Sequence, residues 1–142
     1  MIKKIYIDSD IILDLLAKRE FFYKDAIKIF TLAYEKKIQL YTSGLVFANV
    51  FYILQKIIGT AESKRELKDL RLLIKIVPIN EIMVDMALNS KIGDFEDALQ
   101  YFAARENTIP AILTRNTNDF KIKDILIQTP GEYIKNFISK DL

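Results

Sequence analysis

Short apolar runs alternate with longer helical segments along the whole chain, and this alternation restricts its possible folds more than any other feature. The runs are rich in β-branched and aromatic residues and are too short for helices, so they predict buried strands. The segments between them carry apolar residues at helical spacing. The predicted strands are 2–7, 38–41, 74–79, 110–114 and 125–127, and the predicted helices are 11–17, 23–36, 45–58, 60–73, 81–91, 95–106 and one with Pro130 at its first position.

Strands that alternate with helices are typical of a parallel sheet covered on both faces. We therefore expect an α/β fold with three layers, α/β/α, around a five-stranded parallel sheet. No proline- or glycine-rich stretch divides the chain, and its 142 residues suit one domain of ordinary size. We expect a single domain over residues 1–142.

The composition excludes several kinds of chemistry. The chain has no cysteine and no histidine, which removes disulfides, thiolate catalysis, the Ser-His-Asp triad and histidine-ligated zinc. Its 21 basic and 19 acidic residues give a net charge of +2, which by itself is no strong nucleic-acid signature. No apolar run approaches the roughly 20 residues of a membrane span. We expect a cytoplasmic protein without membrane association.

Acidic and amide side chains gather where predicted strands end and one helix begins. If the first and fourth strands are neighbours, their carboxyl ends meet at the point where strand order reverses, the usual ligand site of such sheets. Three or four carboxylates within a few ångströms would repel one another unless a cation held them. The residues concerned are Asp8 and Asp10 after the first strand, Asp94 and Asp97 at the start of helix 95–106, and Asn116 and Asp119 after the fourth strand.

An oxygen-lined site without histidine or cysteine favours a hard ion, Mg²⁺ or Mn²⁺. Such an ion activates water and stabilises the charge that builds up on a phosphodiester under attack. The acidic residues therefore indicate metal-dependent phosphodiester hydrolysis.

Each of these residues also has a structural interpretation. Asp94 and Asp97 suit the N-terminus of a helix, Ser9 or Asp10 can cap helix 11–17, and residues 116–119 are ordinary turn chemistry. Asp8 is harder to explain in this way, because that helix already has two candidate caps. We expect solvated helix faces at Asp14, Asp25, Asp69 and Asp85.

Four segments of the chain carry a resemblance to a known family: 5–16, 42–54, 94–104 (with the run Asp-Phe-Glu-Asp at 94–97) and 113–120. In this order they resemble the PIN-domain family, in particular its VapC-like toxin ribonucleases, over nearly the whole chain. The resemblance implies a PIN-like α/β/α fold and a Mg²⁺- or Mn²⁺-dependent ribonuclease that cuts single-stranded RNA. It also implies a toxin of a toxin–antitoxin pair, a homodimer that a small antitoxin protein silences.

The resemblance also implies roles for individual residues. One helix departs from the family pattern, because Asn49 stands where a glutamate is common and brings no negative charge. The implied catalytic residues are Asp8, Asp97, Asp94, Asn49 and Asn116, the implied metal ligands are Asp8, Asp94, Asp97 and Asp119, and the implied substrate contacts are Thr114, Arg115 and Ser43, with Lys121 and Lys123 beside the RNA backbone.

Two other functions stay open on the sequence. Asn49 is compatible with a catalytically weakened or inactive module that keeps the fold and binds RNA or protein. A phosphotransfer domain also places acids after its first strand, but it needs a phosphoacceptor aspartate after the third. Here Pro78, Ile79 and Asn80 follow that strand, so we rank this function last.

Overall fold

A computed structural model describes residues 2–120, 122 and 124–141, without the side chains of 119, 140 and 141. Its centre is a parallel sheet with the strand order β3-β2-β1-β4-β5, which confirms the predicted α/β class and the adjacency of the first and fourth strands. This order differs from that of flavodoxin-like receivers, 2-1-3-4-5. The strands are β1 (Lys3–Ile7), β2 (Ile38–Ser43), β3 (Ile74–Val77), β4 (Ala111–Leu113) and β5 (Leu126–Gln128).

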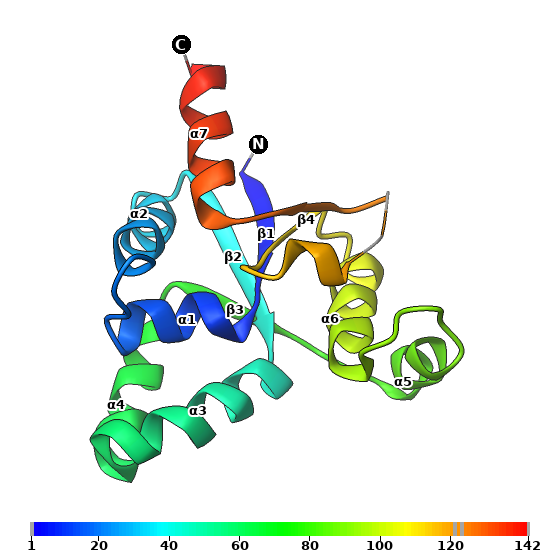
Figure 1. Ribbon diagram of the computed structural model, residues 1–142, viewed down its shortest axis with the longest axis horizontal. Coiled ribbons are helices and arrows are strands. Elements are labelled where there is room, and N and C mark those ends of the chain that lie inside the picture. The colour runs from blue at the N-terminus through cyan, green and yellow to red at the C-terminus, as the bar shows by residue number, and fades with distance from the viewer. Residues whose placement is uncertain (1, 121, 123, 142) are drawn as a thin grey trace.

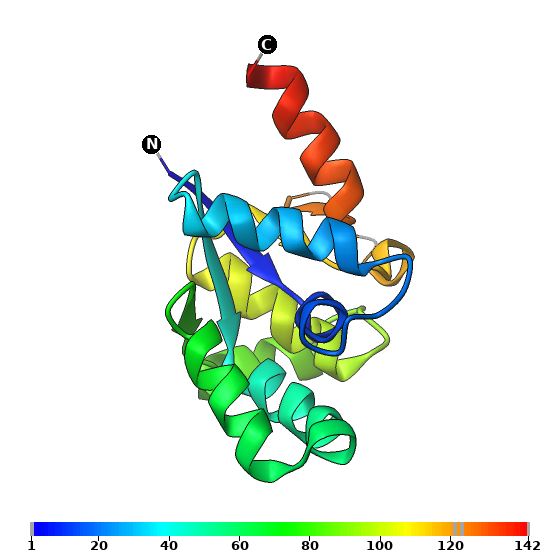
Figure 2. The ribbon, with the colours of Figure 1, turned by 90° about the vertical axis from the view of Figure 1, so that its left-hand side faces the viewer.

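Helices cover the sheet from both sides (Figure 1). α1 and α2 lie on one side and α5 and α6 on the other, while α3 and α4 lie beyond the carboxyl end of β2 (Figures 1 and 2). The helices are α1 (Ser9–Leu16), α2 (Tyr23–Tyr34), α3 (Gly44–Ile58), α4 (Thr60–Leu70), α5 (Glu81–Leu88), α6 (Phe95–Glu106) and α7 (Pro130–Asp141), with a short 3-10 turn at Thr117–Asp119.

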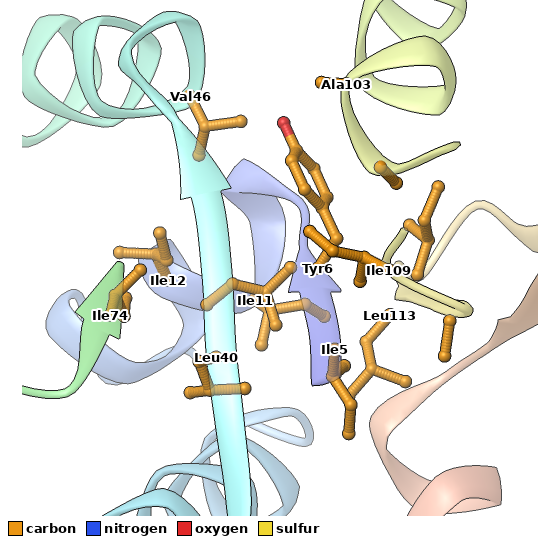
Figure 3. Close-up of a cluster of buried hydrophobic side chains, with 14 of the residues drawn as sticks. Ile5, Tyr6, Ile11, Ile12, Leu40, Val46, Ile74, Ala103, Ile109 and Leu113 are labelled. Carbon is orange, nitrogen blue, oxygen red and sulfur yellow. The ribbon is translucent and has the colours of Figure 1, made fainter. Parts of the chain in front are cut away.

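β1 is the middle strand and holds the core together. Ile5, Tyr6 and Ile7 are 1% exposed or less, and alternation along the strand sends their side chains to both layers. In Figure 3, Tyr6 points away from Ile5, toward the side on which Val46 and Ala103 lie. Because both faces of β1 are buried, the end of this strand is held in place by the layers on either side. Asp8, the next residue, therefore starts from a fixed position.

The predicted boundaries hold closely for α3 and α6 and shift elsewhere. α1 begins two residues earlier than expected. α4 ends at Leu70 instead of residue 73, and α5 ends at Leu88 instead of 91. β3 stops at Val77 because Pro78 has no N–H to donate to a neighbouring strand. Within the described part of the chain, no helix combines the length and apolarity needed to cross a bilayer.

Candidate active site at the carboxyl ends of β1 and β4

Asp8 lies directly beyond β1, at the point where the order of the strands reverses. Its backbone N–H donates to the carbonyl of Leu113 over 3.0 Å, which ties it to the end of β4. Its side chain is the N-cap of α1: Oδ1 accepts from the N–H of Ser9 at 2.6 Å and faces the Ser9 hydroxyl at 3.3 Å. The prediction that Ser9 or Asp10 caps this helix is therefore wrong. Asp8 is 7% exposed and has a fixed orientation.

Thr114, the residue after β4, completes the cradle around Asp8. Its hydroxyl donates to Asp8 Oδ2 at 3.0 Å and accepts from the N–H of Asn116 at 3.1 Å. The sequence predicts a substrate contact at Thr114, but the side chain is fully buried. Both of its hydrogen bonds serve to orient Asp8 and to fold the loop.

Ser43, also predicted as a substrate contact, is buried for a different reason. Its hydroxyl caps α3 by accepting from the N–H of Val46 at 3.4 Å, and it pairs with the hydroxyl of Tyr6 at 2.9 Å. With no exposed surface, Ser43 has a structural role here.

Glu96 in the first turn of α6 is the acidic residue that the sequence reasoning missed. The side-chain amide of Asn49 on α3 donates to Glu96 Oε1 at 2.6 Å. Burial raises the pKa of Glu96, and the negative charges of Asp8 and then Asp94 raise that pKa further, while the hydrogen bond from Asn49 lowers it. The negative charges of Asp8 and Asp94 therefore disfavour the ionised form of Glu96. The only signal in the sequence was its place between Asp94 and Asp97.

Asp94 begins α6. Its Oδ1 accepts from the N–H of Asp97 at 2.9 Å, so the capping interpretation of Asp94 is confirmed. Its side chain is exposed, whereas that of Asp97 is half-buried. The hydrogen bond from the N–H of Asp97 commits one oxygen of Asp94 to the end of the helix.

A second group of charges lies beside Asp8 and contains Asp10, Asp14 and Arg115. Arg115 Nε lies 3.0 Å from Asp14 Oδ2 and 4.0 Å from Asp10 Oδ2, and the backbone N–H of Arg115 donates to that same Asp10 oxygen at 3.0 Å. The guanidinium lies 4.0 Å from the ring centroid of Phe22. Asp14 is 1% exposed, so the prediction of a solvated face there is wrong. Its spacing of four from Asp10 was the available signal, because such residues share a helix face.

Asp10 gives the site a pH-dependent stability that can be measured. Burial, then the charges of Asp8 and Asp14, raise its pKa to about 6, against the opposing effects of Arg115. Because this value exceeds the ordinary value of about 3.9, the folded state holds the proton more tightly. The contribution of Asp10 to the free energy of unfolding is therefore full below about pH 4 and is lost as the pH rises through about 6.

We expect Asp10→Asn to be more stable than the wild type by about 2 kcal/mol at pH 7.5 and to flatten the stability profile between pH 4 and 7. Urea unfolding in EDTA across this range measures both effects. The matched control is Asp85→Asn, on an exposed position of α5. If the free energies of unfolding of Asp10→Asn and the wild type changed in parallel between pH 4 and 7, the raised pKa of Asp10 would be contradicted.

The remaining predicted residues follow β4 in the chain. Asn116 is exposed and precedes the 3-10 turn Thr117–Asp119. The side chain of Asp119 and the residues Lys121 and Lys123 lie outside the described part of the structure. Their predicted roles stay predictions.

The donor set fits a hydrated hard ion better than a closed cage of carboxylates. Within the described residues, no three acidic side chains stand in position to hold a metal ion, so the expected cluster of three or four is not formed there. The negative charge of Asp8 contributes to the raised pKa of Glu96, and the side-chain N–H of Asn49 donates to Glu96. Mg²⁺ typically keeps several waters and uses one or two protein carboxylates. Asp8, held by Ser9 and Thr114, supplies one such carboxylate.

Comparisons with known proteins agree with this architecture. The chain is 27% identical to Ribonuclease VapC1 of Aquifex aeolicus (strain VF5) over 140 residues, which cover 95% of this chain and 96% of that protein. A toxin–antitoxin complex from Klebsiella pneumoniae contains a chain of similar fold, with a TM-score of 0.67 at 20% identity, over 88% of this chain and 96% of that one. VapC20 of Mycobacterium tuberculosis, a toxin that cleaves the sarcin–ricin loop, gives a TM-score of 0.60 at 16% identity, over 76% of this chain and 86% of that one.

The family itself is identified by a sequence match that includes both halves of the site. The model of the PIN domain family matches residues 4–118, which contain Asp8 on one side and Glu96 and Thr114 on the other. This match covers well over half of the chain. The protein therefore belongs to the PIN domain family.

Proposed function

We propose that this protein is a metal-dependent ribonuclease that cuts single-stranded RNA and acts as the toxin of a toxin–antitoxin pair in the cytoplasm. The observation that carries the proposal is the position of Asp8, buried and held by Ser9 and Thr114 where β1 and β4 end side by side. The similarity to Ribonuclease VapC1 over 95% of the chain, as a single domain, supports the same activity.

A divalent ion, when bound, supplies the Lewis acid that activates water and stabilises charge on the phosphodiester. Asp8 and Asp97 would hold this ion, with Asp94, Asn116 and Asp119 acting directly or through waters. The protein itself orients the Asp8 carboxylate, because hydrogen bonds from Thr114 and Ser9 hold its two oxygens in place. Arg115 is partly exposed beside Asp10 and offers a fixed positive charge to the RNA backbone.

Removal of the metal tests the proposal. We expect the purified protein to cut a single-stranded RNA in Mg²⁺ or Mn²⁺, to lose this activity in EDTA, and to regain it when either ion is added in excess. Denaturing gels of an end-labelled RNA measure the cleavage. Equal cleavage with and without EDTA would show that the cleavage needs no divalent metal, and it would contradict the proposal.

The partners follow from the same proposal. A toxin–antitoxin complex from Klebsiella pneumoniae contains a chain of similar fold, which supports an antitoxin protein as a partner here. Under this proposal, the protein also forms a homodimer. Exposed Tyr34 at the end of α2, together with the exposed side chains Tyr52, Ile53, Ile57 and Ile58 of α3, offers surface for such contacts. A short reading frame beside this gene that encodes a DNA-binding pattern would support the toxin assignment. Its product should co-purify with the protein and suppress RNA cleavage.

A second function is favoured by one observation, the neutral side chain of Asn49 together with the absence of a three-acid cluster among the described residues. Under this alternative, the protein is a catalytically inactive module that binds RNA or protein. A calorimetric titration with Mn²⁺ distinguishes the two, because an inactive module without a metal site releases no binding heat at micromolar concentrations.

A further inference from the structure

The loop between α1 and α2 exposes two aromatic rings to solvent. Phe21 is 89% exposed and Phe22 is 42% exposed. Both belong to the run 18–24, in which three basic and three aromatic residues stand with a single acid. Basic residues interleaved with aromatic ones are typical of surfaces that bind single-stranded nucleic acid, because the cations pair with phosphates and the rings stack on bases. α1 leads from the carboxyl end of β1 to this loop (Figure 1).

Phe21 stabilises the fold neither through burial nor through its backbone conformation. Its φ of 74° lies in the left-handed region, where a bulky residue is a rare and costly exception. Its ring is almost fully in solvent, so it gains little from the hydrophobic effect. Glycine or asparagine would suit this position better if only the fold mattered. Residues that cost stability in this way cluster where proteins contact ligands.

Phe22 is connected to the active-site loop by Arg115. The guanidinium lies 4.0 Å from the centroid of the Phe22 ring, and its Nε lies 3.0 Å from Asp14 Oδ2. Arg115 directly follows Thr114, whose hydroxyl donates to Asp8. The eight residues of α1 separate Asp8 from the two rings by roughly 12 Å of helix. The rings are therefore fixed close to the phosphodiester that Asp8 would face, but not at it.

We propose that Phe21, supported by the pair of Phe22 and Arg115, is a stacking platform for an unpaired base of the RNA substrate. This inference rests on the proposed function and adds a contact with a base to a site described so far by its charges. Exposed Lys18 and Lys24 on either side of the rings in the sequence suit the flanking phosphates. A base inside a duplex is already stacked and paired, so the platform favours single strands.

A tryptophan variant tests the stacking directly. The chain contains no tryptophan, so Phe21→Trp has a single indole, and its fluorescence reports on this position alone. We expect a short single-stranded RNA of mixed sequence, titrated in EDTA so that it stays intact, to quench this fluorescence. The same RNA annealed to its complement should not. Leu72→Trp is the matched control, because Leu72 is 85% exposed in the turn after α4, and RNA should leave its fluorescence unchanged.

The affinity for the same RNA, measured by fluorescence anisotropy of a labelled strand, gives a second readout. We expect Phe21→Ala and Phe21→Leu to weaken the Kd by about 10-fold, which corresponds to the loss of one stacked base. Phe21→Tyr should bind within about 2-fold of wild type, and Leu72→Ala should bind as wild type does. Phe21→Gly should bind as weakly as Phe21→Ala but melt about 3 °C above the wild type, since glycine relieves the left-handed backbone.

The outcomes separate this inference from the proposed function. If Phe21→Ala keeps its affinity while the wild type cuts RNA, the platform is refuted, the nuclease proposal survives, and the two rings remain as a contact for a protein. If the wild type binds RNA through Phe21 but does not cut it in Mn²⁺, the nuclease proposal fails and the platform stands. If the wild type binds no single-stranded RNA, both are refuted. If Phe21→Ala fails to fold, Phe21→Trp decides: quenching supports the platform, and its absence overturns it.

Discussion

Replacing Asp8 with asparagine is expected to reduce RNA cleavage by about 1,000-fold, equivalent to about 4 kcal/mol of transition-state stabilisation. The change removes a charged ligand that Ser9 and Thr114 hold in a single orientation. Stability should be unchanged or higher. Asparagine caps a helix as well as aspartate does, and the variant relieves the repulsion that Asp8 exerts on Asp10 and Glu96.

The rate of cleavage in Mn²⁺ and urea unfolding in EDTA measure the two halves of this prediction. Asp85→Asn on the exposed face of α5 is the control, and it should leave both values unchanged. Full activity in Asp8→Asn would refute the assignment of Asp8. A loss of activity together with a large loss of stability would instead show that Asp8 matters as the cap of α1.

Replacing Arg115 with alanine is expected to lower the free energy of unfolding by about 3 kcal/mol at pH 7.5. Among the residues that the structure describes, this change leaves Asp14, 2% exposed in its side chain, paired with the more distant Arg19 at 3.8 Å. Burial already raises the pKa of Asp14, and the positive charge of Arg115 counteracts that rise. Without Arg115, the pKa values of Asp14 and Asp10 rise further, so most of the loss should appear above about pH 6 and little should remain near pH 4.

Urea unfolding of Arg115→Ala at several pH values tests this prediction. Arg65→Ala is the control, because Arg65 forms a surface pair with Glu62 at 2.9 Å in which both side chains are well exposed. That pair should contribute at most about 1 kcal/mol. Adding Asp14→Asn to Arg115→Ala should recover about half of the loss at pH 7.5. A cost for Arg115→Ala no greater than that for Arg65→Ala would contradict the buried network.

The sequence predicted the fold well because its signals are local. The alternation of strands and helices, the cap at Asn80, the glycine with φ of 88° at the end of α3 and the proline that begins α7 each act within a few residues. The neighbouring positions of β1 and β4, which bring Asp8 and Thr114 together, had to be assumed. The structure confirms that assumption.

The site was less predictable, because roles there depend on partners distant in sequence. In the sequence, Ser43 and Thr114 resemble substrate contacts. In the structure, their hydroxyls form buried hydrogen bonds with Tyr6 and Asp8, respectively. Asp14 resembles a solvated acid until the loop after β4 places Arg115 over it. Glu96 resembles an ordinary first-turn acid, and only its contact with Asn49, 47 residues away, singles it out.

The central claim is that Asp8 binds a divalent cation at the reversal point of the sheet. The most direct measurement is the anomalous difference density of crystals soaked in Mn²⁺. We expect one strong peak about 2.1 Å from a carboxylate oxygen of Asp8, with water density completing the coordination. A fully occupied Mn²⁺ elsewhere in the molecule, or no peak beside Asp8 at saturating Mn²⁺, would contradict it.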